Sequence, residues 1–130
     1  MSDPLFSTTI SPRFYETDGL GHINNVSIAG WLEVSRMSFM ASLGDLEGVS
    51  PNDWALAGVK IDYLAETFFG SDVELRVTDV SVGNSSLTLQ SEIWQNGQRT
   101  VAGDSTLVHF DAQAKQSKRI PDSLREQIPQ

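Results

Sequence analysis

A short stretch near the N-terminus combines the residue types that could act on a carbonyl group. Asp18 and His22 lie four residues apart in a glycine-containing segment, and Asn24 and Asn25 follow directly. A carboxylate and an imidazole can each accept a proton from water or from a reacting group. Apolar residues with helical spacing begin at Val26, and unpaired N–H groups at the start of a helix can stabilise a negatively charged oxygen. These residues therefore indicate a site that holds a carbonyl on backbone amides beside an acid.

Each of these residues also has an ordinary structural explanation. Asparagine commonly caps helices, and a single Asp or His in a glycine-containing turn is more often structural than catalytic. The functional interpretation is favoured because an acid, a histidine and a helix start occur within eight residues. Gly19 and Gly21 add to it, since glycine lets the backbone approach a ligand closely.

The segment from Val26 to Leu43 is predicted to form a long helix that starts after Asn24 or Asn25 and ends at Gly44. Apolar residues follow one helical stripe and also occur on other sides of the helix. Most of the circumference of the helix is therefore expected to be buried. The expected stripe is Val26, Ala29, Leu32 or Glu33, Met37, Met40 and Leu43, and the residues on other sides are Ile28, Trp31, Val34 and Phe39.

Glu33 falls on this expected stripe. A carboxylate in such a position needs a partner if it is buried. Arg36 follows three residues later and is the predicted partner in an ion pair that orients the helix. A direct role for Glu33 beside a substrate is the alternative interpretation.

Strand-like patterns occupy most of the remaining sequence. Asn96–Gly97 predicts a tight turn before the last strand, and Pro121 precedes a short C-terminal helix. We expect one α+β domain over residues 1–130, in which a curved antiparallel sheet wraps around the long helix and the last four strands form a meander. Unpaired sheet edges favour a dimer. The strands are expected within residues 5–14, 54–69, 72–82, 86–94 and 98–110.

Composition narrows the possible functions. A length of 130 residues predicts a single domain, and a net charge of −8 argues against general binding to nucleic acids or anionic membranes. The absence of cysteine excludes disulfides, thiolate zinc sites and cysteine nucleophiles. No signal peptide or membrane-spanning run is expected, and the lack of cysteine fits a cytoplasmic protein. Without a G-x-S-x-G elbow, an H-E-x-x-H spacing or a Gly-rich phosphate loop, a serine triad, a metal site and a Rossmann or P-loop nucleotide site are poorly supported.

The segment RFYETDGLGHINNVSIAGWLEVSR, residues 13–36, resembles the signature of hotdog-fold thioesterases of the 4-hydroxybenzoyl-CoA thioesterase-like superfamily. It is most similar to the D-x-x-x-H-x-N-N pattern, followed by W/F-x-E-x-x-R, of long-chain acyl-CoA and plant acyl-ACP thioesterases. The resemblance implies a hotdog fold, with about five strands wrapped around one central helix. It also implies hydrolysis of an acyl thioester at the interface between subunits of a homodimer or homotetramer. Coenzyme A is then part of the substrate, and no separate cofactor is expected.

The resemblance also implies roles for individual residues. Asp18 matches the acid that acts as a general base or as a nucleophile, and His22 matches the histidine of the acyl-CoA and acyl-ACP branch. The N–H groups of Asn25 and Val26 are expected to form the oxyanion hole. Glu33 matches the carboxylate of the helix.

Two positions depart from the family pattern. Ile28 stands where Tyr is usual, and Leu20 stands where plant enzymes carry a functional Asn. The expected contacts to the substrate are Gly21, Asn24, Lys60 and Tyr63, and the candidates for binding the phosphates of coenzyme A are Lys60, Arg76, Arg99 and Arg119.

Two other functions fit the same fold. A hydratase or dehydratase would move a proton and water across a double bond, but its D-x-N-P-x-H pattern differs in spacing from Asp18 and His22. A non-catalytic protein that binds acyl-CoA is the other alternative. The three functions differ in whether thiol is released, enoyl absorbance changes or the ligand only binds.

Overall fold

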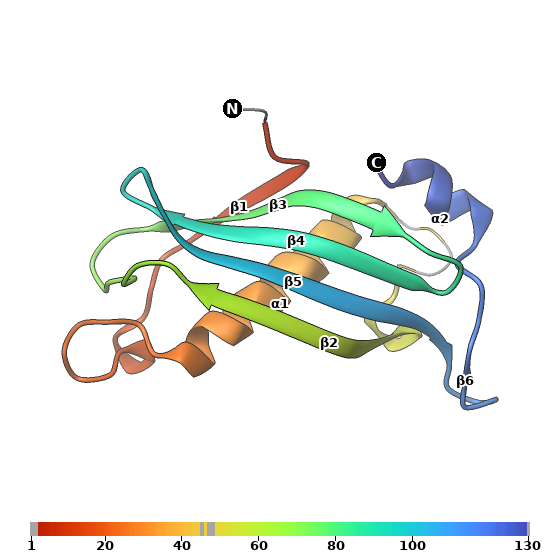
Figure 1. Ribbon diagram of the computed structural model, residues 1–130, viewed down its shortest axis with the longest axis horizontal. Helices are drawn as coiled ribbons and strands as arrows, with labels where there is room; N and C mark the ends of the chain where they lie inside the picture. The colour runs from red at the N-terminus through yellow and green to blue at the C-terminus, as the bar shows by residue number, and fades with distance from the viewer. Residues whose placement is uncertain (1–2, 45, 47–48, 130) are drawn as a thin grey trace.

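One long helix packs against one antiparallel sheet in the computed structural model, which describes residues 3–44, 46 and 49–129 (Figure 1). This arrangement confirms the expected α+β hotdog architecture. The strands are β1 (Phe6–Ile10), β2 (Trp54–Tyr63), β3 (Val73–Val82), β4 (Ser86–Gln95), β5 (Gln98–Asp111) and β6 (Gln116–Ser117). The helices are α1 (Asn25–Ser42) and α2 (Asp122–Gln127), with short 3-10 turns at Phe14–Glu16 and Pro51–Asp53.

The strands lie in the order β1-β3-β4-β5-β2, and β6 pairs with the end of β5. The expected meander is therefore wrong for β2, which pairs with β5 at one edge while β1 pairs with β3 at the other. The reason is the length of the connections. Tight links join β3 to β4 and β4 to β5, whereas residues 64–72 carry the chain from β2 across to β3.

The predicted turn between β4 and β5 is confirmed. Asn96 and Gly97 both have positive φ, 51° and 77°, as a two-residue turn of type I′ requires. The short helix after Pro121 is also confirmed as α2. In the described part of the chain, none of the helices has the length and apolar character needed to cross a membrane.

Helix α1 begins where the capping pattern predicted. Asn24 Oδ1 accepts a hydrogen bond of 2.8 Å from the N–H of Ser27, which satisfies one of the free donors of the first turn. The helix ends at Ser42, and Gly44 follows with a φ of 97°. The expected helix limits are therefore correct to within one residue.

The buried face of α1 differs from the expected stripe. Val26 is 76% exposed and Val34 is 45% exposed, so the helix is not enclosed on most sides within one chain. Apolar residues occur on two sides of α1, and only one of these sides packs on the sheet. The buried positions are Ile28, Trp31, Leu32, Ser35, Arg36, Phe39 and Met40.

Small and alternating residues of the sheet allow α1 to pack closely. Val73, Leu75 and Val77 of β3 are fully buried, which confirms the predicted alternation. A Cβ atom at Gly103 of β5 would lie 3.3 Å from Leu32 Cδ1. Glycine at this position therefore lets the middle of α1 approach the sheet.

Candidate active site

The loop before α1 folds back on itself and places Asp18 beside His22. The N–H of Asp18 donates to the carbonyl of His22 at 2.9 Å, and Thr17 pairs with Ile23. Gly19 and Gly21 have φ values of 91° and 86°, which other residues rarely adopt. The closed loop brings Asp18 Oδ2 to 3.7 Å from His22 Nδ1, so the structure groups the two residues that the sequence singled out.

His22 also contacts the connection between β2 and β3. Its Nδ1 lies 3.5 Å from Glu66 Oε2, and its ring meets the ring of Phe68 edge-on at 5.1 Å. The backbone supports this contact, because the N–H of Phe69 donates to the carbonyl of Gly21 at 2.9 Å. Glu66 is a site residue that the sequence analysis missed, since it lies far along the chain.

Two backbone donors at the start of α1 are free for a ligand. Asn24 caps Ser27, but the N–H groups of Asn25 and Val26 precede Ile28, the first donor of the helix ladder, and have no partner among the described residues. The positive end of the helix dipole lies at the same place. This geometry is suited to an oxygen atom that gains negative charge.

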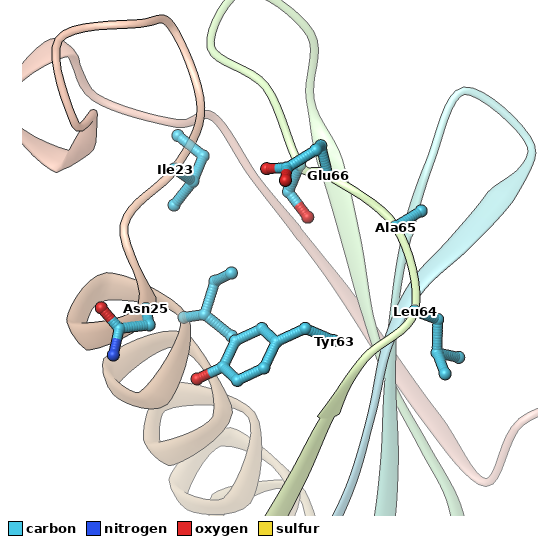
Figure 2. A pocket seen from close by; sticks show the side chains of 8 residues that line it. Ile23, Asn25, Tyr63, Leu64, Ala65 and Glu66 are labelled. Carbon is cyan, nitrogen blue, oxygen red and sulfur yellow. The ribbon is translucent and has the colours of Figure 1, made fainter.

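A cavity of about 410 Å³ is lined by Asn25, the first of the two residues whose amides are free. Figure 2 shows the ring of Tyr63 extending from the end of β2 toward the first turn of α1, where Asn25 lies. Ile28 lines the cavity at the position where the family pattern has Tyr. The lining residues are Ile23, Asn25, Ile28, Tyr63, Leu64, Ala65, Glu66 and Thr67.

Neither Asp18 nor His22 is among the residues that line this cavity, although His22 contacts Glu66 of its wall. Their side chains are 39% and 31% exposed. Asp18 Oδ1 accepts a hydrogen bond of 2.9 Å from the N–H of Leu20, which leaves Oδ2 directed at the histidine. Within one chain, Glu66 is the acidic group that belongs to both the cavity wall and the histidine contact.

A family model described as the thioesterase-like superfamily matches residues 12–128. The chain belongs to this family. The Bacillus subtilis protein YsmA, which is described as uncharacterized, is 33% identical over 84 residues. That match covers 65% of this chain and 57% of the length of YsmA.

Solved structures of the thioesterase-like fold align with nearly the whole chain. A predicted thioesterase from Bacillus stearothermophilus is 33% identical, with a TM-score of 0.83 over 93% of this chain and 91% of the other. A Thermus thermophilus thioesterase solved with coenzyme A and Zn is 24% identical, with a TM-score of 0.86 over 96% and 98%. The Staphylococcus aureus protein SAV2348, solved with coenzyme A, is 16% identical, with a TM-score of 0.85 over 98% and 83%.

The helix carboxylate of the thioesterase-like pattern, Glu33, lies apart from the amides of the first turn. Glu33 lines a second cavity. The predicted ion pair between Glu33 and Arg36 is wrong, because no carboxylate of the described residues lies within 4.0 Å of Arg36. Arg36 Nη1 instead donates to Ser105 Oγ at 3.0 Å. Burial lowers the pKa of the Arg36 guanidinium, and the charge of Glu33 partly opposes this shift.

The basic residues considered for the phosphates of coenzyme A do not gather at the cavity. Each lies within 4.0 Å of a neighbouring carboxylate on the surface, which accounts for its charge without a ligand. The pairs are Lys60 with Asp62 at 3.7 Å, Arg76 with Glu74 at 2.6 Å, Arg99 with Glu92 at 2.8 Å and Arg119 with Asp122 at 2.7 Å.

A second acid that the sequence analysis missed holds the loop on the helix. Glu16 is only 6% exposed, and its carboxylate accepts hydrogen bonds from Trp31 Nε1 at 2.8 Å and from the N–H of Arg13 at 2.7 Å. The carbonyl of Glu16 also accepts from the N–H of Asn24 at 2.8 Å. Glu16 therefore ties both ends of the loop that carries Asp18 to α1.

Proposed function

We propose that this chain hydrolyses an acyl thioester of coenzyme A, or of an acyl carrier protein, to a free acid and a thiol. The observation that carries the proposal is the pair of free amides of Asn25 and Val26 at the start of α1, where Asn25 lines a cavity. Asp18 lies beside His22, which contacts Glu66 of the same cavity wall. Membership of the thioesterase-like superfamily supports it. A structural relative solved with coenzyme A supports the nature of the leaving group.

The free amides provide a place for the thioester carbonyl. Its oxygen accepts hydrogen bonds from the N–H groups of Asn25 and Val26, and these bonds strengthen as the carbonyl carbon is attacked. The dipole of α1 stabilises the same negative charge. Collapse of the tetrahedral intermediate breaks the carbon–sulfur bond and expels the thiolate, which then takes a proton.

Asp18 supplies the attack in one of two ways. As a general base it removes a proton from water, and the resulting hydroxide adds to the carbonyl carbon. As a nucleophile its carboxylate adds directly, so that the departing thiolate leaves a mixed anhydride that water then hydrolyses. His22, at 3.7 Å, orients the carboxylate or the water in either route.

A panel of acyl-CoA substrates with a thiol reagent tests the proposed reaction. Thiol release above the uncatalysed rate is the expected result, with the protein at catalytic concentration. A loss of enoyl absorbance without thiol release would instead identify a hydratase. Binding of the acyl-CoA with neither change would show a passive binding protein and refute hydrolysis.

Single-turnover hydrolysis in heavy-oxygen water separates the two roles of Asp18. The base route places oxygen from the solvent in the first molecule of acid product. The anhydride route, when water attacks the Asp18 carbonyl, transfers an unlabelled enzyme oxygen to that first product. Mass spectrometry of the first-turnover acid therefore distinguishes the two routes.

A second copy of this chain is proposed to complete the site. Strand β2 is an edge of the sheet, and an unpaired edge can pair with a second copy. Leu56 and Val59 of β2 are each 50% exposed, and Val26 and Val34 of α1 are exposed as well. An apolar surface of this kind on a small domain is typical of a subunit interface.

Val59→Arg is expected to convert the proposed dimer to a monomer and to lower hydrolysis at least about tenfold, because a charge would be buried in an apolar contact. Light scattering and thiol release measure the two effects. Gln90→Arg places the same side chain on an exposed position of β4 and serves as the control. A Val59→Arg protein that keeps the mass and activity of the wild type would refute an interface at β2.

A further inference from the structure

A second cavity, of about 190 Å³, lies between α1 and β2. Its wall is mostly apolar, and two charged side chains interrupt it. Neighbouring positions of α1 and β2 line the two cavities: Ile28 and Tyr63 line the first, and Ala29 and Ile61 line the second. The full lining is Ala29, Gly30, Glu33, Arg36, Leu56, Val59 and Ile61.

Arg36 is the unusual member of this lining. The residue is 5% exposed, and its Nη1 donates to Ser105 Oγ. Its Nε has no hydrogen-bond partner, and no carboxylate within 4.0 Å balances its charge among the described residues. A buried guanidinium with an unused donor is costly unless an acceptor reaches it. Such a group at the wall of a cavity points to a ligand that carries an acceptor.

The position of Arg36 sets the length of this ligand. Asn25, whose amide is proposed to hold the thioester carbonyl, precedes Arg36 by about three helical turns, which correspond to about 16 Å along the axis. The long arginine side chain leans back toward the start of the helix and shortens this gap. A medium-length acyl chain therefore spans the distance from the amides to the guanidinium.

The charge of Glu33 determines which kind of ligand oxygen suits Arg36. Glu33 lines the same cavity and interacts electrostatically with Arg36. A ligand carboxylate would be repelled by Glu33, whereas a hydroxyl or keto oxygen accepts from Arg36 without adding negative charge. A neutral oxygen is therefore the better match to this pair of side chains.

We infer that Arg36 is a specificity-determining residue that binds a neutral oxygen at the far end of a medium-chain acyl group. The inference rests on the proposed thioesterase function for the placement of the thioester. The rest of the chain lies against the apolar part of the cavity wall, which includes Ala29 and Ile61. Arg36 takes no part in the chemical step and acts on the choice of substrate alone.

Binding of two non-hydrolysable thioether analogues, S-decyl-CoA and its ω-hydroxy counterpart, tests this role. Wild-type protein is expected to bind the hydroxy analogue about tenfold more tightly, the usual strength of a hydrogen bond to a charged group. Arg36→Met keeps the length of the side chain without its donors and is expected to abolish the preference. Lys118→Met removes an exposed cation and is expected to leave the preference unchanged.

A second variant and a folding control keep this test decisive. Arg36→Gln retains neutral donors and is expected to show an intermediate preference, so the test stands even if Arg36→Met fails to fold. Thermal unfolding shows whether each variant is folded. Equal binding of the two analogues by the wild type, or an unchanged preference in folded Arg36→Met, would overturn the inference and leave Arg36 a partner for water or for a second copy.

Thiol release from decanoyl-CoA and ω-hydroxydecanoyl-CoA separates this inference from the proposed function. Release from both with equal kcat/KM, together with equal binding, would refute the role of Arg36 and leave the thioesterase proposal standing. Release from neither of these substrates and from none of the acyl-CoA panel would refute hydrolysis of acyl-CoA, while the binding preference would still decide the role of Arg36. A higher kcat/KM for the hydroxy substrate, lost in Arg36→Met, is the result expected if both are correct.

Discussion

Replacing Asp18 with alanine is expected to lower thioester hydrolysis by at least about 100-fold, because a positioned base or nucleophile is lost. The fold is expected to survive. The side chain is 39% exposed, and its hydrogen bond to the N–H of Leu20 lies within the turn itself. Thiol release under saturating acyl-CoA measures the activity, and the urea midpoint of unfolding measures the stability.

Asp18→Asn separates the charge from the shape of this residue. Asparagine keeps an oxygen that can accept from the N–H of Leu20, so the turn is retained while the carboxylate is lost. Deamidation would regenerate aspartate, so mass spectrometry of the purified variant must accompany the assay. Asp79→Ala, at an exposed position of β3, controls for the loss of a surface charge. Activity near that of the wild type in both Asp18 variants would contradict its assignment.

The sequence predicted the elements of this fold better than their order. Alternation located β3, β4 and β5 because each of these strands has one buried and one more exposed face, whereas β2 has no buried residue within one chain. Periodicity carries no information about which strands are neighbours. The link over residues 64–72 is much longer than the Asn96–Gly97 turn. A connection of this length indicates that β2 does not pair with β3, the next strand in the sequence.

The buried face of α1 could not be read from the pattern for a related reason. The helix is apolar on two sides, and a helical period fits either side equally well. Val26 and Val34 belong to the side that remains exposed in one chain, whereas Ile28 and Phe39 pack on the sheet. Arg36 lies among the buried residues although its type is typical of a surface.

Some residues of the candidate site are close together in the sequence, and others come from distant segments. Asp18, His22 and the amides at Asn25 are close in the sequence, so spacing alone grouped them. Glu66 reaches His22 through the pairing of His22 with Phe68, which joins segments more than forty residues apart. A contact of this kind depends on the strand order, so no local pattern predicts it.

Glu16→Ala is expected to lower the free energy of unfolding by about 2–4 kcal/mol, because one buried and one partly buried donor lose their acceptor. These donors are Trp31 Nε1 and the N–H of Arg13, at 2.8 and 2.7 Å from the carboxylate. Urea unfolding monitored by circular dichroism measures the change. Glu16→Gln keeps the size of the side chain but replaces one acceptor oxygen with a donor, so its loss is expected to be smaller, about 1–2 kcal/mol.

The same substitutions report on the site, because Glu16 connects the loop of Asp18 to α1. A loosened loop holds Asp18 less firmly relative to the start of α1, and displacement of a catalytic group by about 1 Å can lower the rate about 100-fold. We therefore expect both Glu16 variants to lose activity at a urea concentration where they remain folded. Glu126→Ala removes an exposed carboxylate from α2 and is expected to change neither property. A Glu16→Ala protein as stable as the wild type would show that Trp31 and Arg13 find other acceptors, and the loop would then owe its position to the backbone pairing of Thr17 with Ile23 alone.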